Sequence, residues 1–307
     1  MLDILALGEA MVEFNQTGEA GGRLYLQGFG GDTSNFAVSA ARQGAAVGVL
    51  SALGDDVYGA MLRAMWREEG IDDSGVATDA DAFTAIYFVT HDAAGHHFSF
   101  FRRGSAASRM TFAQLPMEAF ASTRVLHVSG ISLAISESAR ETCFAAMRAA
   151  RAAGAMVSFD TNFRAQLWPL ATARAAIDEA IALADICLPS HDDLAALTGL
   201  DAADALIGHC LARGARIVAL KHGAAGAWVA DATRQVRIAP HPCKPVDATG
   251  AGDAFGGAFV ARIVAGDDLE AAGRYAAAAA ALSTEGYGAV EPIPRAARVR
   301  EALLRAG

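Results

Sequence analysis

One carboxylate, Asp253, stands in a glycine-rich stretch whose composition suits phosphate chemistry. Residues 246–259 read VDATGAGDAFGGAF, in which a Gly-Ala-Gly turn leads straight into an apolar segment with helical spacing. The start of a helix exposes unpaired N–H groups with partial positive charge, so it can bind an anion. Asp253 could instead be an ordinary first-turn acid that stabilises the helix dipole. Stabilisation of a helix dipole does not require the further polar groups of Asp247 and Thr249. Their presence favours a phosphate-binding turn that contains a base.

A second glycine motif precedes an asparagine near the start of the chain. Residues 30–35 read GGDTSN, and an alanine-rich segment follows them. The two glycines allow the backbone to approach a sugar closely, and Asn35 can both donate to and accept from hydroxyl groups. An ordinary helix N-cap at Thr33 or Ser34 would explain the same residues without a ligand. The motif alone leaves both interpretations open.

These motifs lie among short β-rich apolar runs that alternate with longer helical segments. This alternation is typical of βαβ units and a mostly parallel sheet. Strands are predicted at residues 4–7, 47–52, 125–128, 156–160, 186–188, 217–220 and 227–229. Helices are predicted at residues 35–43, 58–69, 136–152, 170–184, 202–212, 253–265 and 269–283. Open sheets of this kind place their ligand sites beyond the carboxyl ends of the strands.

Two regions depart from this alternation and predict a small β-sheet flap. Residues 83–90 and 96–102 alternate in polarity and flank the turn Asp92-Ala93-Ala94-Gly95, as in a β-hairpin. Residues 11–15 and 23–27 could supply further strands. We therefore expect one domain over residues 1–307, with a lid formed by segments near 11–30 and 83–103.

The bulk composition argues against several classes of protein. The chain has 307 residues, is 53% apolar and carries a formal charge of −9, which disfavours a nucleic-acid-binding surface. Its 4 cysteines form no Cys-x-x-Cys pair, so we expect them to be reduced. The start does not resemble a signal peptide, and the alanine run at 276–281 is too short to span a bilayer. The prediction is a cytoplasmic enzyme that binds neither nucleic acid nor membrane.

The Asp253 loop resembles the C-terminal signature of the ribokinase-like (PfkB) carbohydrate kinases, Asp-Thr/Pro-x-Gly-Ala-Gly-Asp-x-Phe. GGDTSN is similar to the family's N-terminal Gly-Gly-x-x-x-Asn motif, and the similarity continues through residues 54–59 and 70–71. The resemblance implies an α/β three-layer sandwich with a mostly parallel central sheet and a small β-sheet lid. It also implies that Asp253 removes the proton from a substrate hydroxyl. Gly250, Ala251 and Gly252 would form an anion hole for the transferring phosphoryl group.

The same resemblance implies ATP and Mg²⁺. Residues 220–227 (LKHGAAGA) are similar to the family's Lys-x-Gly-x-x-Gly segment, which lies against ATP; a plain hairpin turn with a solvated lysine is the alternative. The family's Asn-x-x-Glu motif for magnesium-bound water corresponds to Ser190–Asp193, where serine and aspartate still offer oxygen ligands. Asp193 would bind Mg²⁺ through water, and Asp247 occupies a position that some members use for a monovalent cation such as K⁺. The implied cofactor-binding residues are Asn162, Ser190, Lys221, Gly223, Gly226, Thr249, Gly250 and Gly252.

The segments expected to bind the sugar resemble those of one branch of the family. Residues 100–108 (FFRRGSAAS) place arginines after paired aromatics, where one could grip a carboxylate bidentately, although solvated arginines at a flap edge are the alternative. Together with 126–131 (LHVSGI) and 160–168 (DTNFRAQLW), this segment resembles 2-keto-3-deoxygluconate kinases, in which Arg102 and Arg164 would bind the sugar acid. The implied substrate-binding residues are Gly30, Gly31, Asn35, Tyr87, Phe101, Arg102, Arg164 and Asp253. Glu9 and Glu13 are expected to be structural or rim groups.

We therefore expect ATP-dependent phosphorylation of the terminal hydroxyl of 2-keto-3-deoxygluconate by a homo-oligomeric enzyme. A fructokinase or another neutral-sugar kinase is the alternative within the family. A non-catalytic sugar-acid sensor with the same fold is an alternative from another class, although the intact Gly-Ala-Gly-Asp argues against it. A dinucleotide-dependent dehydrogenase fits less well, because no Gly-x-Gly-x-x-Gly follows the first predicted strand.

Overall fold

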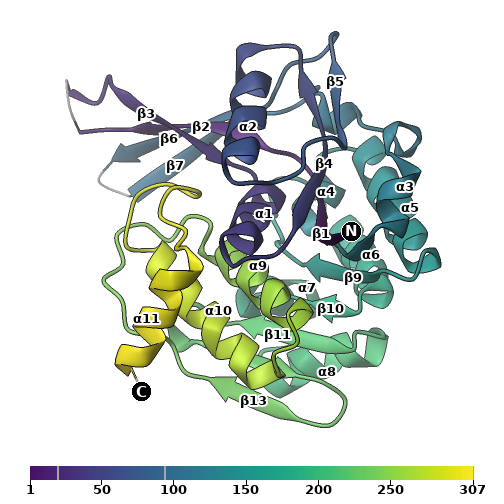
Figure 1. The fold of residues 1–307 in the computed structure, drawn as a ribbon, viewed down its shortest axis with the longest axis vertical. Coiled ribbons are helices and arrows are strands. Elements are labelled where there is room, and N and C mark those ends of the chain that lie inside the picture. The colour runs from purple at the N-terminus through teal and green to yellow at the C-terminus, as the bar shows by residue number, and fades with distance from the viewer. Residues whose placement is uncertain (19–20, 93–94, 307) are drawn as a thin grey trace.

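The centre of the fold is a nine-stranded sheet, described by a computed structural model that covers residues 1–18, 21–92 and 95–306 (Figure 1). Its strands are β1 (Leu2–Leu7), β4 (Val47–Gly54), β5 (Val76–Asp79), β8 (Thr123–Ser129), β9 (Met156–Asp160), β10 (Ile186–Cys187), β11 (Ile217–Lys221), β12 (Ala227–Ala230) and β13 (Gln235–Ile238). Their order is β13-β12-β11-β10-β9-β8-β1-β4-β5. All neighbours from β5 to β11 pair in parallel, and β12 and β13 add an antiparallel edge.

Helices cover both faces of this sheet and bury two apolar cores (Figure 1). One face carries α1 (Asp32–Arg42), α2 (Val57–Glu68), α9 (Ala251–Val264), α10 (Leu269–Ser283) and α11 (Ala296–Ala306). The other carries α3 (Met117–Ala121), α4 (Gly130–Ala134), α5 (Glu137–Ala152), α6 (Leu170–Leu183), α7 (His191–Thr198) and α8 (Ala203–Arg213). The sheet is therefore the middle layer of three, as predicted.

A second, four-stranded sheet forms the lid at one side of the body (Figure 1). It consists of β2 (Met11–Gln16), β3 (Tyr25–Gly30), β6 (Ile86–Asp92) and β7 (Gly95–Phe101), in the order β3-β2-β6-β7. β6 and β7 form the predicted antiparallel hairpin, whereas β2 pairs with β6 in parallel. Ala93 and Ala94 of the predicted turn lie outside the described residues.

The predicted strands of the central sheet all occur, with ends that agree to within two residues. The predicted helices also occur, and α1 differs most because it begins at Asp32 rather than Asn35. The predictions did not include β5, β13, α3, α4, α7 or α11. Five of these elements have eight residues or fewer, which is too short for a hydrophobic period to be distinguished, whereas α11 is clearly amphipathic and could have been predicted from its pattern.

Within the described ranges, no single helix is long and apolar enough to cross a bilayer. Only α7 and α8 taken together meet that length and composition, as a pair bent by 73°. Core helices of soluble proteins meet the same criteria.

Candidate active site

Asp253 lies in the first turn of α9, directly after a left-handed glycine. Gly250 is the helix N-cap with a φ of 74°, and a Cβ there would lie 3.0 Å from the carbonyl oxygen of Ala289. The Ala251 amide already donates to a carbonyl within the turn over 3.2 Å. Helix geometry provides no intrahelical acceptor for the amides of Gly252 and Asp253. These two amides are therefore better placed to bind an anion than the Ala251 amide that the sequence predicted.

The carboxylate of Asp253 is held by a side chain from another helix. Nδ2 of Asn35, in α1, donates to Oδ2 of Asp253 over 2.8 Å. The two helices approach closely at a glycine, because a Cβ on Gly257 would lie only 2.3 Å from the carbonyl oxygen of Phe36. The two glycine motifs of the sequence therefore meet at one carboxylate.

The start of α1 depends on a glycine rather than on a capping side chain. Gly31 is the N-cap, with a φ of 97° and no side-chain cap, and the helix begins at Asp32. A Cβ on Gly31 would lie 2.4 Å from the carbonyl oxygen of Glu9. The alternative that Thr33 or Ser34 is an ordinary N-cap is therefore wrong, because both residues already lie inside the helix.

The surroundings of Asp253 favour its protonated form. Burial, followed by the negative charges of Asp32 and Asp160, raises the pKa of Asp253 to about 8. The bond from Asn35 and the positive charge of Lys221 oppose this shift. A carboxylate that titrates near neutral pH can accept a proton from a hydroxyl and release it again at working pH.

Two further carboxylates face this site, although the sequence analysis assigned them no role. Asp160, the last residue of β9, forms a buried ion pair with Lys221 and accepts from the backbone N–H of Asn162 over 3.2 Å. Nδ2 of Asn162 donates to Oδ2 of Asp32 over 3.0 Å, and Asn162 itself has a left-handed φ of 29°. The signal for Asp160 was its position at the carboxyl end of a central strand, where α/β sheets bind ligands.

Lys221 lies over the start of α9 rather than in solvent. Its side chain is 13% exposed, and a Cβ on Gly252 would lie 3.6 Å from its Nζ atom. The alternative of a solvated lysine is therefore wrong, and the ammonium group stands next to the predicted anion hole. Gly223 and Gly226 follow it with φ values of 50° and 94°. A Cβ on Gly226 would meet the carbonyl of Ile238 at 2.2 Å, so backbone packing alone requires that glycine.

Ser190 and Asp193, the predicted magnesium-side pair, are joined at the start of α7. Oγ of Ser190 accepts from the backbone N–H of Asp193 over 3.2 Å as the helix N-cap. Oδ2 of Asp193 accepts from the N–H of Phe163 over 3.1 Å, and Oδ1 lies 4.0 Å from Nη1 of Arg164. Arg164 therefore lies beside the residues assigned to the nucleotide.

The carboxylates near Asp253 could bind Mg²⁺ together with water or phosphate oxygens. Asp32, Asp160 and Asp193 offer the carboxylate oxygens that Mg²⁺ prefers. Among the residues that the structure describes, no three His, Cys, Asp or Glu side chains lie close enough together to hold a metal by themselves. The binding of Mg²⁺ through water at Asp193 stays a prediction, with which this arrangement is compatible.

Asp247 shapes the turn that precedes the anion hole. Its Oδ1 accepts from the N–H and the hydroxyl of Thr249, over 2.9 and 2.7 Å. Its Oδ2 accepts from the N–H of Gly288 over 3.0 Å. Thr249 therefore supports the turn from within. The role of Asp247 at a monovalent cation stays a prediction.

Tyr87 of β6 is buried in the lid, where the charges of the site act on it. Its hydroxyl donates to Oε2 of Glu13 and lies so near Gly30 that a Cβ there would be 2.4 Å away. Burial and the nearby carboxylates of Glu13 and Asp253 raise the pKa of Tyr87. Glu13 is 3% exposed, so it is a buried group rather than a rim group. Phe101, by contrast, is 56% exposed.

Arg102 carries an internal counterion. Its Nη2 atom lies 2.6 Å from Oε2 of Glu9, an ion pair in which the N–H does not point directly at the oxygen. The two side chains are 11% and 1% exposed, and Ser105 donates to the other Glu9 oxygen over 2.6 Å. Burial is the largest influence on the Glu9 carboxyl and raises its pKa. Arg102 is therefore not a solvated flap residue, and its charge is already balanced within the protein.

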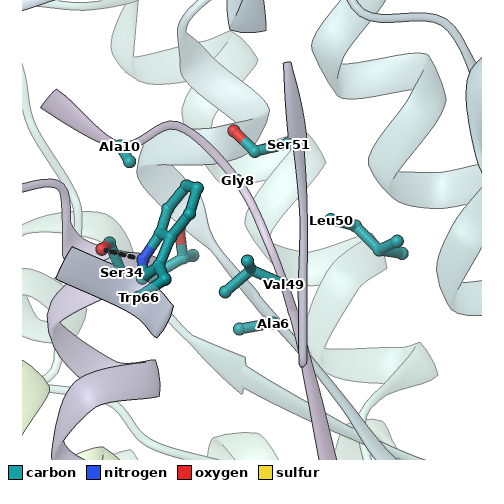
Figure 2. A pocket seen from close by; sticks show the side chains of 9 residues that line it. Ala6, Gly8, Ala10, Ser34, Val49, Leu50, Ser51 and Trp66 are labelled. Atoms are coloured by element: carbon teal, nitrogen blue, oxygen red, sulfur yellow. Dashed lines mark hydrogen bonds between the residues drawn. The ribbon is translucent and has the colours of Figure 1, made fainter. Parts of the chain in front are cut away.

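A small internal cavity lies beside the Gly8–Ala10 connection between body and lid (Figure 2). Its volume is about 10 Å³, which is room for one water molecule and too little for a sugar. Trp66 donates from Nε1 to Oγ of Ser34 over 3.0 Å, and Ser51 lies on the opposite side. Oγ of Ser51 is buried without a partner among the described residues, so one water would satisfy it.

Comparison with known proteins identifies the family. The model of the pfkB family of carbohydrate kinases matches residues 1–296. Fructokinase-1 of Oryza sativa subsp. japonica is 35% identical over 306 residues, covering 95% of this chain and 94% of its own.

Solved structures agree with this match. A putative ribokinase II of E. coli, solved in complex with ATP and Mg²⁺, has a TM-score of 0.92 at 26% identity and covers 99% of this chain and 100% of its own. The fructokinase of Vibrio cholerae O395, solved with fructose, ADP and a calcium ion, has a TM-score of 0.88 at 28% identity, with 98% and 99% covered. The fold is therefore ribokinase-like, and the chain belongs to the pfkB family of carbohydrate kinases.

Proposed function

We propose that this chain is an ATP-dependent kinase of a neutral ketohexose, with fructose as the first candidate. The observation that carries the proposal is the ion pair of Arg102 with Glu9, because a neutralised arginine provides no net charge for a substrate carboxylate. The similar fructokinases support it. The sequence-based expectation of a sugar acid rested on Arg102 and Arg164 together, and the first of these already has a buried counterion.

The charge around the base supports the same choice. Asp32 and Asp160 raise the pKa of Asp253, and the ammonium group of Lys221 opposes them. Glu13 adds a buried carboxylate on the lid beside Tyr87. A carboxylate on the sugar would meet repulsion here, whereas a neutral polyol would find acceptors for its hydroxyl hydrogens.

In the proposed reaction, Asp253 accepts the proton of a primary sugar hydroxyl. The hydroxyl oxygen forms a bond to the γ-phosphorus of ATP, and the bond from that phosphorus to the bridging oxygen of ADP breaks. The amides of Gly252 and Asp253, with the ammonium group of Lys221, would stabilise the charge on the transferring group. Mg²⁺, when bound near Asp32, Asp160 and Asp193, would neutralise phosphate charge. Asp253 then releases its proton to solvent.

A sugar acid such as 2-keto-3-deoxygluconate is a second candidate, which two observations favour. The side chain of Arg164 is 49% exposed, and its nearest carboxylate, on Asp193, is 4.0 Å away. Nε of Arg102 is buried without an acceptor among the described residues, so it retains a donor for a ligand. Both arginines could therefore still contribute to binding an acid.

A substrate panel separates these candidates. Fructose, ribose, glucose, 2-keto-3-deoxygluconate and its galactonate epimer would be compared by kcat/KM, with ADP release as the readout. We expect fructose to have the highest kcat/KM. The second candidate would be established if the enzyme preferred either acid and if Arg102→Ala raised the KM for that acid but not for fructose. The absence of ADP release with every sugar, in a protein that binds ATP, would support a sensor instead.

A further inference from the structure

A buried arginine outside the site already described, Arg42, holds a loop that touches the phosphoryl-transfer machinery. Arg42 is the last residue of α1, the helix that begins at the sugar-side glycine motif. Its side chain is 8% exposed and forms an ion pair of 2.7 Å with Glu69, which is 10% exposed. A buried arginine with an ion-pair partner is ordinary. The guanidinium group also makes several contacts with backbone carbonyls, which are less usual.

One nitrogen of Arg42 gathers three backbone carbonyls from a segment about 250 positions away. Nη1 donates to the carbonyl oxygens of Val290, Glu291 and Ile293 over 3.0, 3.2 and 2.6 Å. The segment has no regular secondary structure, and the only backbone hydrogen bond to these carbonyls among the described residues runs from the N–H of Ile293 to Val290, over 3.2 Å. Arg42 therefore supplies side-chain donors to the carbonyls of an irregular, partly buried turn.

The neighbouring end of that segment lies against the anion hole. The N–H of Gly288 donates to Asp247 over 3.0 Å, and a Cβ on Gly250 would meet the carbonyl oxygen of Ala289 at 3.0 Å. A Cβ on Gly288 would lie 3.2 Å from Oε1 of Glu13, so the lid also reaches this point. The loop of residues 288–293 thus contacts the phosphate turn and the lid at one end and Arg42 at the other.

We propose that Arg42 is a positioning residue for phosphoryl transfer, which acts by fixing the loop 288–293 against the Gly250 turn. With its carbonyls anchored, the loop holds Gly288 in place to donate to Asp247, and the Asp247–Thr249 turn then sets the direction of the Gly252 and Asp253 amides. Removal of the anchor lets the loop relax and misplaces those amides. This role is independent of which sugar the enzyme accepts.

The test compares Arg42→Met with two controls. Glu69→Gln removes the ion pair but leaves the three carbonyl contacts, and Arg295→Gln removes only an exposed partner of Glu69. Hydrogen exchange of the amides in residues 284–293 and the affinity for a non-hydrolysable Mg·ATP analogue are measured well below the melting temperature of each variant. These two readouts do not require the sugar to be known, and kcat/KM for ATP is measured as well, with the sugar that the substrate panel identifies.

We expect Arg42→Met to speed exchange at Gly288 and Ala289 and to weaken binding of the Mg·ATP analogue. It should also lower kcat/KM for ATP roughly 10- to 100-fold, the size that misplacement of reacting groups produces. The KM for the sugar should be unchanged, and both controls should exchange and turn over like the wild type. Arg42→Lys keeps the positive charge but not the planar arrangement of donors, so its loss of kcat/KM for ATP should be intermediate. It replaces Arg42→Met in the test if that variant does not fold. The proposal would be overturned if Arg42→Met matched Arg295→Gln in loop exchange and in ATP kinetics. It would also be overturned if Glu69→Gln changed both as much as Arg42→Met does.

Discussion

The side-chain amide of Asn35 donates to the carboxylate of Asp253 over 2.8 Å across the contact between α1 and α9. The bond engages one oxygen of the carboxylate, which leaves the other for a substrate hydroxyl in the proposed reaction. It also favours the ionised form of Asp253 against burial and the charges of Asp32 and Asp160. One contact therefore orients the proposed base and opposes the rise in its pKa.

Replacement of the base tests its role directly. Asp253→Asn keeps the size of the side chain but cannot accept a proton, so kcat should fall roughly 10²- to 10⁴-fold, the span of general acid–base catalysis. Circular dichroism and urea unfolding should show an intact fold. Turnover near that of the wild type would exclude Asp253 as the base.

The pH profile should move in opposite directions in two variants. In the wild type, kcat/KM should rise with pH as Asp253 ionises near its pKa of about 8, because this parameter reports groups of the free enzyme. Asp32→Asn removes a negative charge that raises this pKa, so the acid limb should shift to lower pH. Asn35→Ala removes the bond that lowers it, so the limb should shift to higher pH. An acid limb that is the same in all three proteins would assign the profile to another group.

Stability should also depend on the proton of Asp253. Its pKa is about 8 when folded, against about 4 for an unperturbed aspartate, so the folded protein binds this proton more tightly than the unfolded chain. The free energy of unfolding should therefore decrease as the pH rises from about 4 to 8. Asp253→Asn, compared by urea unfolding across this range, should lose that part of the dependence. A wild-type slope retained in the variant would show that other groups produce it.

Truncation of Arg102 should destabilise the protein through Glu9. Arg102→Ala leaves a carboxylate of 1% exposure without its cation, and breaking a buried ion pair costs about 3–5 kcal/mol. Arg103→Ala, at the exposed neighbouring position, should change the free energy of unfolding by less than about 0.5 kcal/mol. Urea titrations of both variants measure the difference. Equal stability of the two variants would contradict the structural role of the ion pair.

Close packing of α1 on α9 should be necessary for activity. Gly257→Ala places a methyl group 2.3 Å from the carbonyl oxygen of Phe36, so the helices must separate, at a cost of about 1–3 kcal/mol. The bond from Asn35 to Asp253 should lengthen, and kcat should fall with stability. Gly208→Ala in α8 is the matched control, since nothing lies within 4 Å of its Cβ position; it should stabilise the helix by up to about 1 kcal/mol. Wild-type kcat in Gly257→Ala would show that helix separation does not reach the site.

The sequence alone determined which residues could take part in phosphoryl transfer, and most of the fold. The Asp253 loop, the GGDTSN motif and the strands of the central sheet follow from local patterns, namely glycine turns, hydrophobic period and strand length. Such patterns depend on neighbouring residues, so they can be interpreted without the fold. The lid followed for the same reason, from the alternation that forms β6 and β7.

The partners of the charged side chains were decided only by the tertiary structure. Arg102 meets Glu9, and Lys221 meets Asp160, through contacts between segments that no spacing in the sequence relates. The acidity of Asp253 likewise depends on burial and on charges from other elements. Electrostatic interactions depend on distance in space and on exclusion of water, and both exist only after the chain has folded. The expected carboxylate-binding arginine therefore became, in the fold, one half of an internal ion pair.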